Sequence, residues 1–157
     1  MTYAISVRRV APRALASVHE RMAVRDVPAR FRSSLDQVYA AAKSHAIALD
    51  GQNVFVYRAG PTSLADVDFG VGVAGPFAPV GRVVYSQVSG GEVATTTHWG
   101  DYAALGAAHD AVVAWCHGHG HSLAGVSWEV YGHWSDNPAK RCTDVFHLLR
   151  PAMHSDG

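Results

Sequence analysis

The chain carries the same order of expected elements twice, and this duplication constrains its fold most. Apolar and polar residues alternate in segments typical of strands, and apolar residues recur at three- and four-residue spacing in segments typical of helices. The resulting order is strand, strand, helix, strand, strand, followed by the same order again. Residues 14–19 precede the similar residues 93–98 by about 79 positions, and 65–66 precede 143–144 by about 78. A period this long indicates two copies of one folding unit rather than a solenoid.

Each expected helix is marked by residues that typically start or end helices. Asp26 and Pro28 supply a capping carboxylate and a first-turn proline for a helix over residues 28–49, which we expect to end near Gly51. Asp101 is expected to cap a second helix over residues 102–117. The strands are expected over residues 3–9, 14–22, 54–57, 67–74, 82–88, 92–98, 126–134 and 142–149.

This pattern predicts an α+β fold of two duplicated β-β-α-β-β units. We expect one domain over residues 1–157, with repeat one at about 1–78 and repeat two at about 80–150. Each unit would form an antiparallel sheet that packs one helix, with both helices on the same side. The bare sheet faces, or the seam between the two halves, would then form a concave site suited to a small molecule, and we expect a central cleft between the halves.

Composition excludes several classes of partner. Lys and Arg total 13, Asp and Glu total 13, and no basic block occurs, so we expect no direct nucleic-acid partner. No apolar run approaches the length of a membrane span, and the early Arg8 and Arg9 argue against a signal peptide. The two cysteines, Cys116 and Cys142, suit a reducing compartment, so we expect a cytoplasmic protein. The sequence does not predict an oligomeric state.

Loose motifs across the chain resemble the GyrI-like effector-binding domain, a small-molecule-binding module of bacterial transcription regulators. The matching stretches are the strand at 66–73, Gly90-Gly91, the corner at 98–102, Trp115, Gly120, the strand residues 128–131 and the strand start at 142–144. Two positions depart from the family pattern: Asp101 stands where proline is usual, and Thr143-Asp144 where Thr-Glu is usual. The resemblance implies two strand-rich repeats with one helix each, and a member that stands alone without a DNA reader.

Glu129 is the principal candidate for a binding residue. It lies in the middle of an aromatic strand, where burying a carboxylate without a partner is costly. Strand alternation places Ser127, Glu129, Tyr131 and His133 on one face, and Trp128, Val130 and Trp134 on the other, which we expect to pack under helix 102–117. The resemblance implies that Glu129 holds the positive charge of a lipophilic cation. The alternative is a glutamate on a solvated sheet face.

Aromatic residues form a second group of candidates. Phe55, Tyr57, Trp99, Tyr102, Tyr131 and Phe146 are expected to line the cleft with Glu129. Aromatic faces stack on a planar body and attract its cationic centre. Each ring taken alone could equally be a core residue.

The histidines suggest a metal site that we do not favour. His117, His119 and His121 alternate where a helix ends in glycines, so they are poorly placed to chelate, although His98, His109 and His133 could converge. We therefore expect no metal. No nucleophile motif or dinucleotide-binding glycine loop occurs, so we expect no cofactor.

Two functions remain open. The first is capture of a hydrophobic, planar and often cationic small molecule, for sequestration or sensing. The second is hydrolysis of reactive cyclopropane-type toxins, which the resemblance also implies. Glu129 would then act as the general base, with Tyr131 or Tyr57 donating a hydrogen bond or proton to the substrate.

Overall fold

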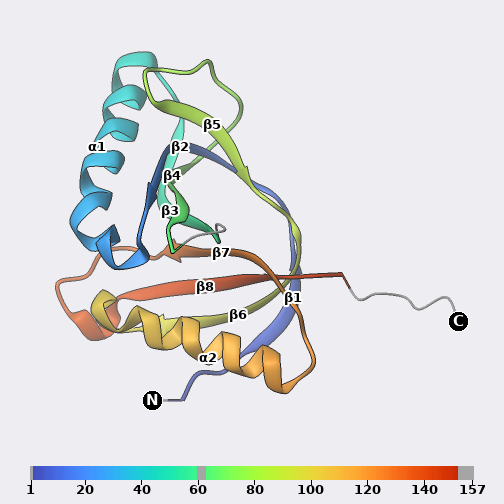
Figure 1. Cartoon of the computed structure of the whole chain (residues 1–157). Coiled ribbons are helices and arrows are strands. Elements are labelled where there is room, and N and C mark those ends of the chain that lie inside the picture. Colours follow the sequence, from blue (N-terminus) through green and yellow to red (C-terminus); the bar gives the residue numbers. More distant parts are fainter. Residues whose placement is uncertain (1, 60–62, 152–157) are drawn as a thin grey trace, which may run out of the picture.

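One eight-stranded sheet carries two long helices in the computed structural model, which describes residues 2–59 and 63–151 (Figure 1). The helices are α1 (Val27–His45) and α2 (Leu105–Gly118). The strands are β1 (Ser6–Val10), β2 (Arg13–Met22), β3 (Leu49–Ala59), β4 (Ala65–Val73), β5 (Val83–Val88), β6 (Gly91–Trp99), β7 (Leu123–Tyr131) and β8 (Cys142–Leu149). Neither helix of this described part is long and apolar enough to cross a membrane.

The strand order shows how the two repeats are joined. The order is β1-β6-β8-β7-β3-β4-β2-β5, and every pair is antiparallel. Exchanging each strand for its counterpart in the other repeat gives the same order read backwards, so the sheet has an internal two-fold relation centred on the β3–β7 pair. The expected α+β duplication is therefore confirmed. The sequence did not predict that each repeat gives its first strand, β1 or β5, to the sheet of the other repeat.

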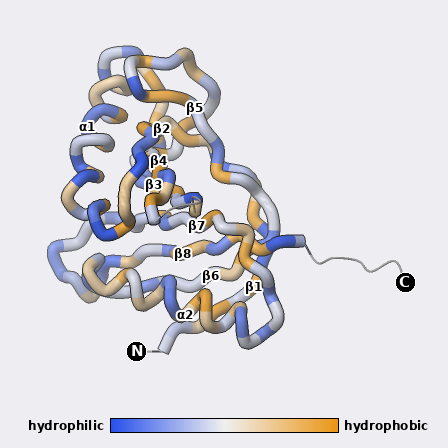
Figure 2. The backbone as a smooth tube through the Cα atoms, in the orientation of Figure 1, coloured by the Kyte–Doolittle hydropathy of each residue, from blue (hydrophilic) through white to orange (hydrophobic). Residues whose placement is uncertain are grey.

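Both helices cover the same face of the sheet, as expected. Helix α1 packs on β2 and β4, whereas α2 packs on β6 and β8 (Figure 1). The turns of α1 alternate between hydrophilic and hydrophobic residues, as they should when one side of a helix lies on a sheet (Figure 2). The central strands β3 and β7 lie between the two helices, so their helix-side residues can form the floor of a cleft.

The opposite face of the sheet packs against itself instead of against a helix. A single apolar cluster there joins side chains from both halves, namely Leu15, Val54, Val56, Val88, Val93, Trp128, Val130 and Phe146. The missing side chain of Gly70 makes room for this packing, because a Cβ there would lie 3.1 Å from Leu15 Cδ1. The helix-free face is thus a second core.

Several expected boundaries are wrong, among them the start of β3, which lies at Leu49 and not at residue 54, and the start of β7, which lies at Leu123 and not at residue 126. The first helix ends at His45, not near Gly51, because Ala46 takes a left-handed conformation (φ 54°) and its N–H still bonds the Ala42 carbonyl. The chain can then start β3 at Leu49, where it pairs with Val73. The strand expected over residues 126–134 ends at Tyr131.

The two expected caps also differ in outcome. Asp101 accepts a hydrogen bond from the Ala103 N–H and caps the short 3₁₀ turn Tyr102–Ala104 before α2. Asp26 precedes α1, but its side chain makes no capping hydrogen bond.

Candidate functional site

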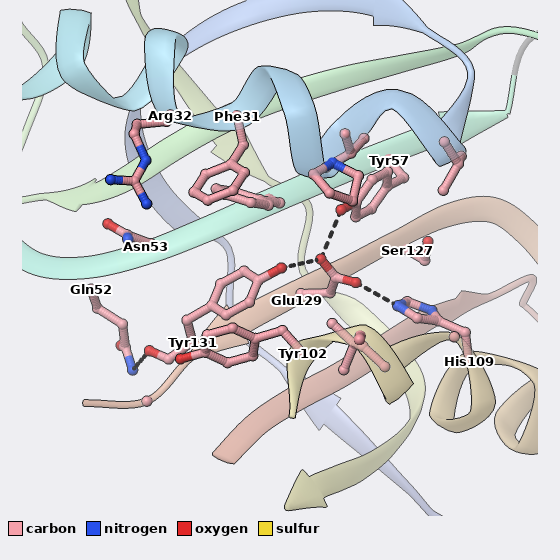
Figure 3. A pocket seen from close by; sticks show the side chains of 18 of the residues that line it. Phe31, Arg32, Gln52, Asn53, Tyr57, Tyr102, His109, Ser127, Glu129 and Tyr131 are labelled. Carbon is pink, nitrogen blue, oxygen red and sulfur yellow. Dashed lines mark hydrogen bonds and ion pairs between the residues drawn. The ribbon is translucent and has the colours of Figure 1, made fainter. Parts of the chain in front are cut away.

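A cleft of about 1120 Å³ opens on the helix side of the sheet, over its centre. Its walls come from the start of α1 and the start of α2, and its floor comes from β3 and β7 (Figure 3). Because β3 and β7 belong to different repeats, the cleft lies at the seam between the two halves. Of the two locations that the duplication left open, the cleft occupies the seam and not a bare sheet face.

Glu129 lies on the cleft floor and makes three side-chain hydrogen bonds. Its Oε1 accepts from the Tyr57 hydroxyl at 2.8 Å and from the Tyr131 hydroxyl at 2.7 Å (Figure 3). Its Oε2 lies 2.8 Å from His109 Nε2. The residue is only 4% exposed, so these donors replace the water that the carboxylate loses on folding.

The two tyrosines that bond Glu129 are held in their protonated form. Burial, followed by the nearby Glu129 charge, raises the pKa of Tyr57 far above the ordinary tyrosine value. The same two causes raise the pKa of Tyr131 well above it. Both phenols therefore remain O–H donors to the carboxylate at physiological pH.

A pair of histidines continues the network away from the cleft. His109 Nδ1, on α2, lies 2.9 Å from His147 Nε2, on β8. Burial, and then the neighbouring His109, lowers the pKa of His147 to about 4. His147 is therefore neutral at physiological pH, and the chain of contacts runs from Glu129 through His109 to a neutral imidazole.

Aromatic rings cover the deeper part of the cleft. The Phe55 ring contacts the Phe31 ring at 5.7 Å and the Tyr131 ring at 4.9 Å between centroids. The Tyr102 ring meets Tyr131 edge-on at 5.5 Å. These contacts bring rings from α1, β3, β7 and the turn before α2 around one space.

Trp134 extends this aromatic surface to the mouth of the cleft. Its ring lies 6.1 Å from that of Tyr102, and the Arg141 guanidinium lies 3.7 Å from its centroid. Trp134 lines the cleft and remains 64% exposed, so the part of its ring that Arg141 does not cover is accessible to a ligand. The cleft thus offers aromatic surface from floor to rim.

Most of the expected binding residues meet in this cleft, but two do not. Phe55, Tyr57, Tyr102, Glu129 and Tyr131 all line it. Phe146 points to the helix-free face, where it stacks on Trp128 with 5.4 Å between centroids. Trp99 ends β6 outside the cleft lining and is 55% exposed.

The relation of the Glu129 strand to α2 is the reverse of our expectation. Alternation separates Glu129 and Tyr131 from Trp128 and Val130, as predicted. However, Trp128 and Val130 belong to the helix-free core, and α2 lies on the side of Glu129. The physical reason is that the curved sheet fills its other face with its own side chains, so no helix is needed there. Trp134, which we expected beside Trp128 and Val130, instead lines the cleft, because β7 ends at Tyr131 and strand alternation does not extend to residue 134.

Several lining residues were not among the candidates. Of these, His109 was considered only as a metal ligand, and Phe31 was not considered as a binding residue. His147, which contacts His109 from outside the cleft lining, was not considered either. His109 directly follows Ala108 and lies four residues after Leu105, both buried on the sheet side of α2. That spacing could have placed His109 at the edge of the buried face, although not beside Glu129.

The alternating histidines near the end of α2 contact a tryptophan. The Trp115 ring stacks on His119 at 4.1 Å and on His121 at 5.5 Å between centroids. Among residues 2–59 and 63–151, no group of three or more His, Cys, Asp or Glu side chains is arranged to hold a metal ion. The buried Cys116 and the partly buried Cys142 are both free thiols.

Comparison with solved structures places the fold among known proteins. The C-terminal domain of EcmrR is 15% identical with a TM-score of 0.76, and the match covers 97% of this chain and 100% of that domain. SAV2435 bound to tetraphenylphosphonium is 12% identical with a TM-score of 0.70, over 99% and 98% of the two chains. A hydrolase from Listeria innocua is 12% identical with a TM-score of 0.63, over 93% and 91%.

These matches show the fold. The chain has the architecture of the GyrI-like domains that its motifs resemble. It spans 58% of the length of the EcmrR chain that was solved in a complex with DNA. No protein-family model and no curated protein matches the sequence.

Proposed function

We propose that the cleft binds a hydrophobic, planar and often cationic small molecule, for sequestration or sensing. The observation that carries this proposal is the buried Glu129 carboxylate on the floor of an aromatic cleft. A carboxylate in this setting attracts a positive charge strongly because little water screens it. The surrounding rings would stack on the flat body of the ligand and add cation–π attraction.

The neighbours with the same fold support this proposal. SAV2435 was solved with tetraphenylphosphonium, a lipophilic cation, and it matches almost the whole of this chain. The cleft volume of about 1120 Å³ is slightly above the range of about 300–1,000 Å³ usual for small-molecule sites, so the cleft has room for such a ligand.

A pair of matched dyes tests the role of the carboxylate. The 10-methylacridinium ion and 10-methylacridone have nearly the same tricyclic shape, but only the first is charged. Glu129→Gln should weaken the binding of 10-methylacridinium by about 2–5 kcal/mol, because the substitution removes one partner of a desolvated charge pair. The neutral acridone should lose much less affinity. Fluorescence titration measures both.

The exposed Glu92 provides the control, since Glu92→Gln changes the same functional group on β6, outside the cleft lining. It should leave both affinities unchanged. An equal loss for both dyes in Glu129→Gln would show that Glu129 is not the counter-charge.

Hydrolysis is a second candidate, supported by the contacts of Glu129. A carboxylate that bonds both an imidazole and two phenols combines a base with hydrogen-bond donors. Glu129 would take a proton from a water that attacks a carbon of a strained ring. The ring C–C bond at that carbon would then break, and its electron pair would pass to a carbonyl oxygen conjugated with the ring. Tyr57 or Tyr131 would give a proton to that oxygen and recover one from Glu129, which it contacts. A hydrolase from Listeria innocua has the same fold.

Product analysis by mass spectrometry distinguishes the two functions. A hydrolase should convert more than one equivalent of a cyclopropane-containing electrophile per protein, and Glu129→Gln should abolish that turnover. A binding protein should hold the compound unchanged.

A further inference from the structure

The carboxylate on the cleft floor already has a basic partner within the protein. His109 Nε2 lies 2.8 Å from Glu129 Oε2, and His109 Nδ1 lies 2.9 Å from His147 Nε2. Both ring nitrogens of His109 are therefore engaged, one with an anion and the other with an imidazole. An imidazolium makes both contacts by donating from both nitrogens, whereas a neutral ring makes them by donating from Nε2 to Glu129 and accepting at Nδ1 from His147.

Building on the proposed function, we infer that His109 determines how the cleft distinguishes charged from neutral ligands. In the free protein its imidazolium neutralises Glu129. A monocationic ligand takes over this role, and a proton leaves His109 as the ligand binds. A neutral ligand leaves the imidazolium in place, and no proton is exchanged.

The exchange follows from the balance of charge around one buried carboxylate. Glu129 carries one negative charge, and the donors on its Oε1 are the neutral hydroxyls of Tyr57 and Tyr131. A cation beside Glu129 would meet the positive imidazolium across a few ångströms of poorly screened space. Loss of one proton from His109 removes this repulsion and leaves a neutral ion pair of ligand and carboxylate.

His147 provides a route for the proton. In the proposed protonated state, the N–H at Nδ1 of His109 would donate to Nε2 of His147, which lies 2.9 Å away. As the ligand enters, this proton moves to His147 Nε2, and the proton on His147 Nδ1 passes to water. His147 then donates to the neutral His109, so the contact is kept with its direction reversed. His147 is suited to this part because it is neutral before the transfer and only partly buried.

Other ionisable groups also face His109 or its cleft. Glu129 and Tyr131 come from β7, Tyr57 from β3 and His147 from β8, and the remaining ionisable cleft residues are Arg25, Arg32, Asp50, Tyr102, Asp110 and His133. The two tyrosines next to Glu129 have pKa values raised far beyond the neutral range, so they do not titrate there. In the described part of the chain, only Glu129 and His147 form side-chain hydrogen bonds with His109.

The first test measures dye affinity between about pH 6 and about pH 8. The dissociation constant of 10-methylacridinium should fall by about tenfold for each unit by which pH rises, as long as His109 is protonated in the free protein, since one proton is released per cation bound. The affinity of 10-methylacridone should not change with pH. His109→Gln keeps an amide donor for Glu129 but cannot release this proton, so it should abolish the pH dependence for the cation.

His117→Gln is the matched control, because His117 is an exposed histidine of the same helix outside the cleft lining. It should keep the full pH dependence. A pH-independent affinity of the wild-type protein for 10-methylacridinium would overturn the inference. The proposed function would still stand if Glu129→Gln lowered the affinity for 10-methylacridinium more than the affinity for 10-methylacridone.

The second test needs no ligand. The imidazole ¹⁵N resonances of the free protein at about pH 6 should show two N–H protons on His109, and Glu129→Gln should remove one of them at the same pH. A neutral His109 in the free wild-type protein overturns the inference whatever the cleft binds. Failure of both dyes to bind overturns the proposed function, and the exchange with it.

Discussion

Replacement of Trp128 by alanine should destabilise the protein far more than replacement of Trp134, although the two residues are close in sequence. Trp128 is 4% exposed and stacks on Phe146 at an interplanar angle of 14° in the helix-free core. Truncation of a buried aromatic side chain costs about 3–5 kcal/mol of unfolding free energy. At about 2–4 °C per kcal/mol for a chain of this length, Trp128→Ala should lower Tm by about 6–20 °C.

Trp134 lies in a different environment, at the mouth of the cleft. It is 64% exposed, and it contacts the Arg141 guanidinium and the Tyr102 ring and donates a hydrogen bond to the exposed Asp136. An exposed cation–π contact contributes about 0.5–1 kcal/mol, so Trp134→Ala should cost about 1 kcal/mol or less. Trp134→Ala should instead weaken the binding of 10-methylacridinium by about 1–2 kcal/mol, because the dye loses an aromatic ring on which to stack.

Urea denaturation followed by far-ultraviolet circular dichroism measures both stabilities without relying on tryptophan emission. Dye titration on the same samples measures binding. Equal destabilisation by the two substitutions, with no loss of dye affinity in Trp134→Ala, would refute the assignment of the two sheet faces to core and cleft.

Two further predictions concern stability alone. The pKa of His147 is lowered on folding to about 4, so the unfolded chain binds more protons than the folded protein between about pH 6.5 and 4, and the stability contributed by this residue is lost as pH falls through that window. His147→Gln should flatten that part of the curve of unfolding free energy against pH, and an unchanged slope would contradict the lowered pKa of His147. Ala46→Gly should raise the unfolding free energy by up to about 1 kcal/mol in urea denaturation, because glycine adopts the left-handed conformation at φ 54° without strain. A loss of stability would show that the greater conformational freedom of glycine in the unfolded chain outweighs the relief of backbone strain in the folded protein.

Strand alternation predicts which residues of one strand share a face, and only that part of the candidate site could be predicted from the sequence. The period of a strand puts Glu129 and Tyr131 on one face, and the structure keeps them there with the Tyr57 of the paired strand. Alternation cannot say which face a helix covers. Phe146 and Trp99 were grouped with the cleft because they are aromatic strand residues, and residue type does not separate an inward from an outward position.

His109 shows the limit more clearly. Its place on α2 follows from helical spacing, but its distance to Glu129 depends on how α2 lies across β6 and β8 and on how these strands reach β7. These are contacts between residues far apart in sequence. No local pattern contains them, so the partner of the carboxylate could not be inferred before the fold was known.

The sequence by itself determined the duplicated order of elements, the two helices and the side of its strand on which Glu129 lies. These properties follow from periods of two and of 3.6 residues, which short-range backbone geometry imposes wherever the chain has the right residues. Only the tertiary structure decided that β1 and β5 exchange between repeats, that the helix-free face closes on itself, and that Glu129 meets His109 between the two helices. The reason is that strand pairing and sheet curvature are set by the burial of apolar surface across the whole chain. The alternation within one strand separates its residues into two sets, but it does not say which set faces the helices until the whole sheet has formed.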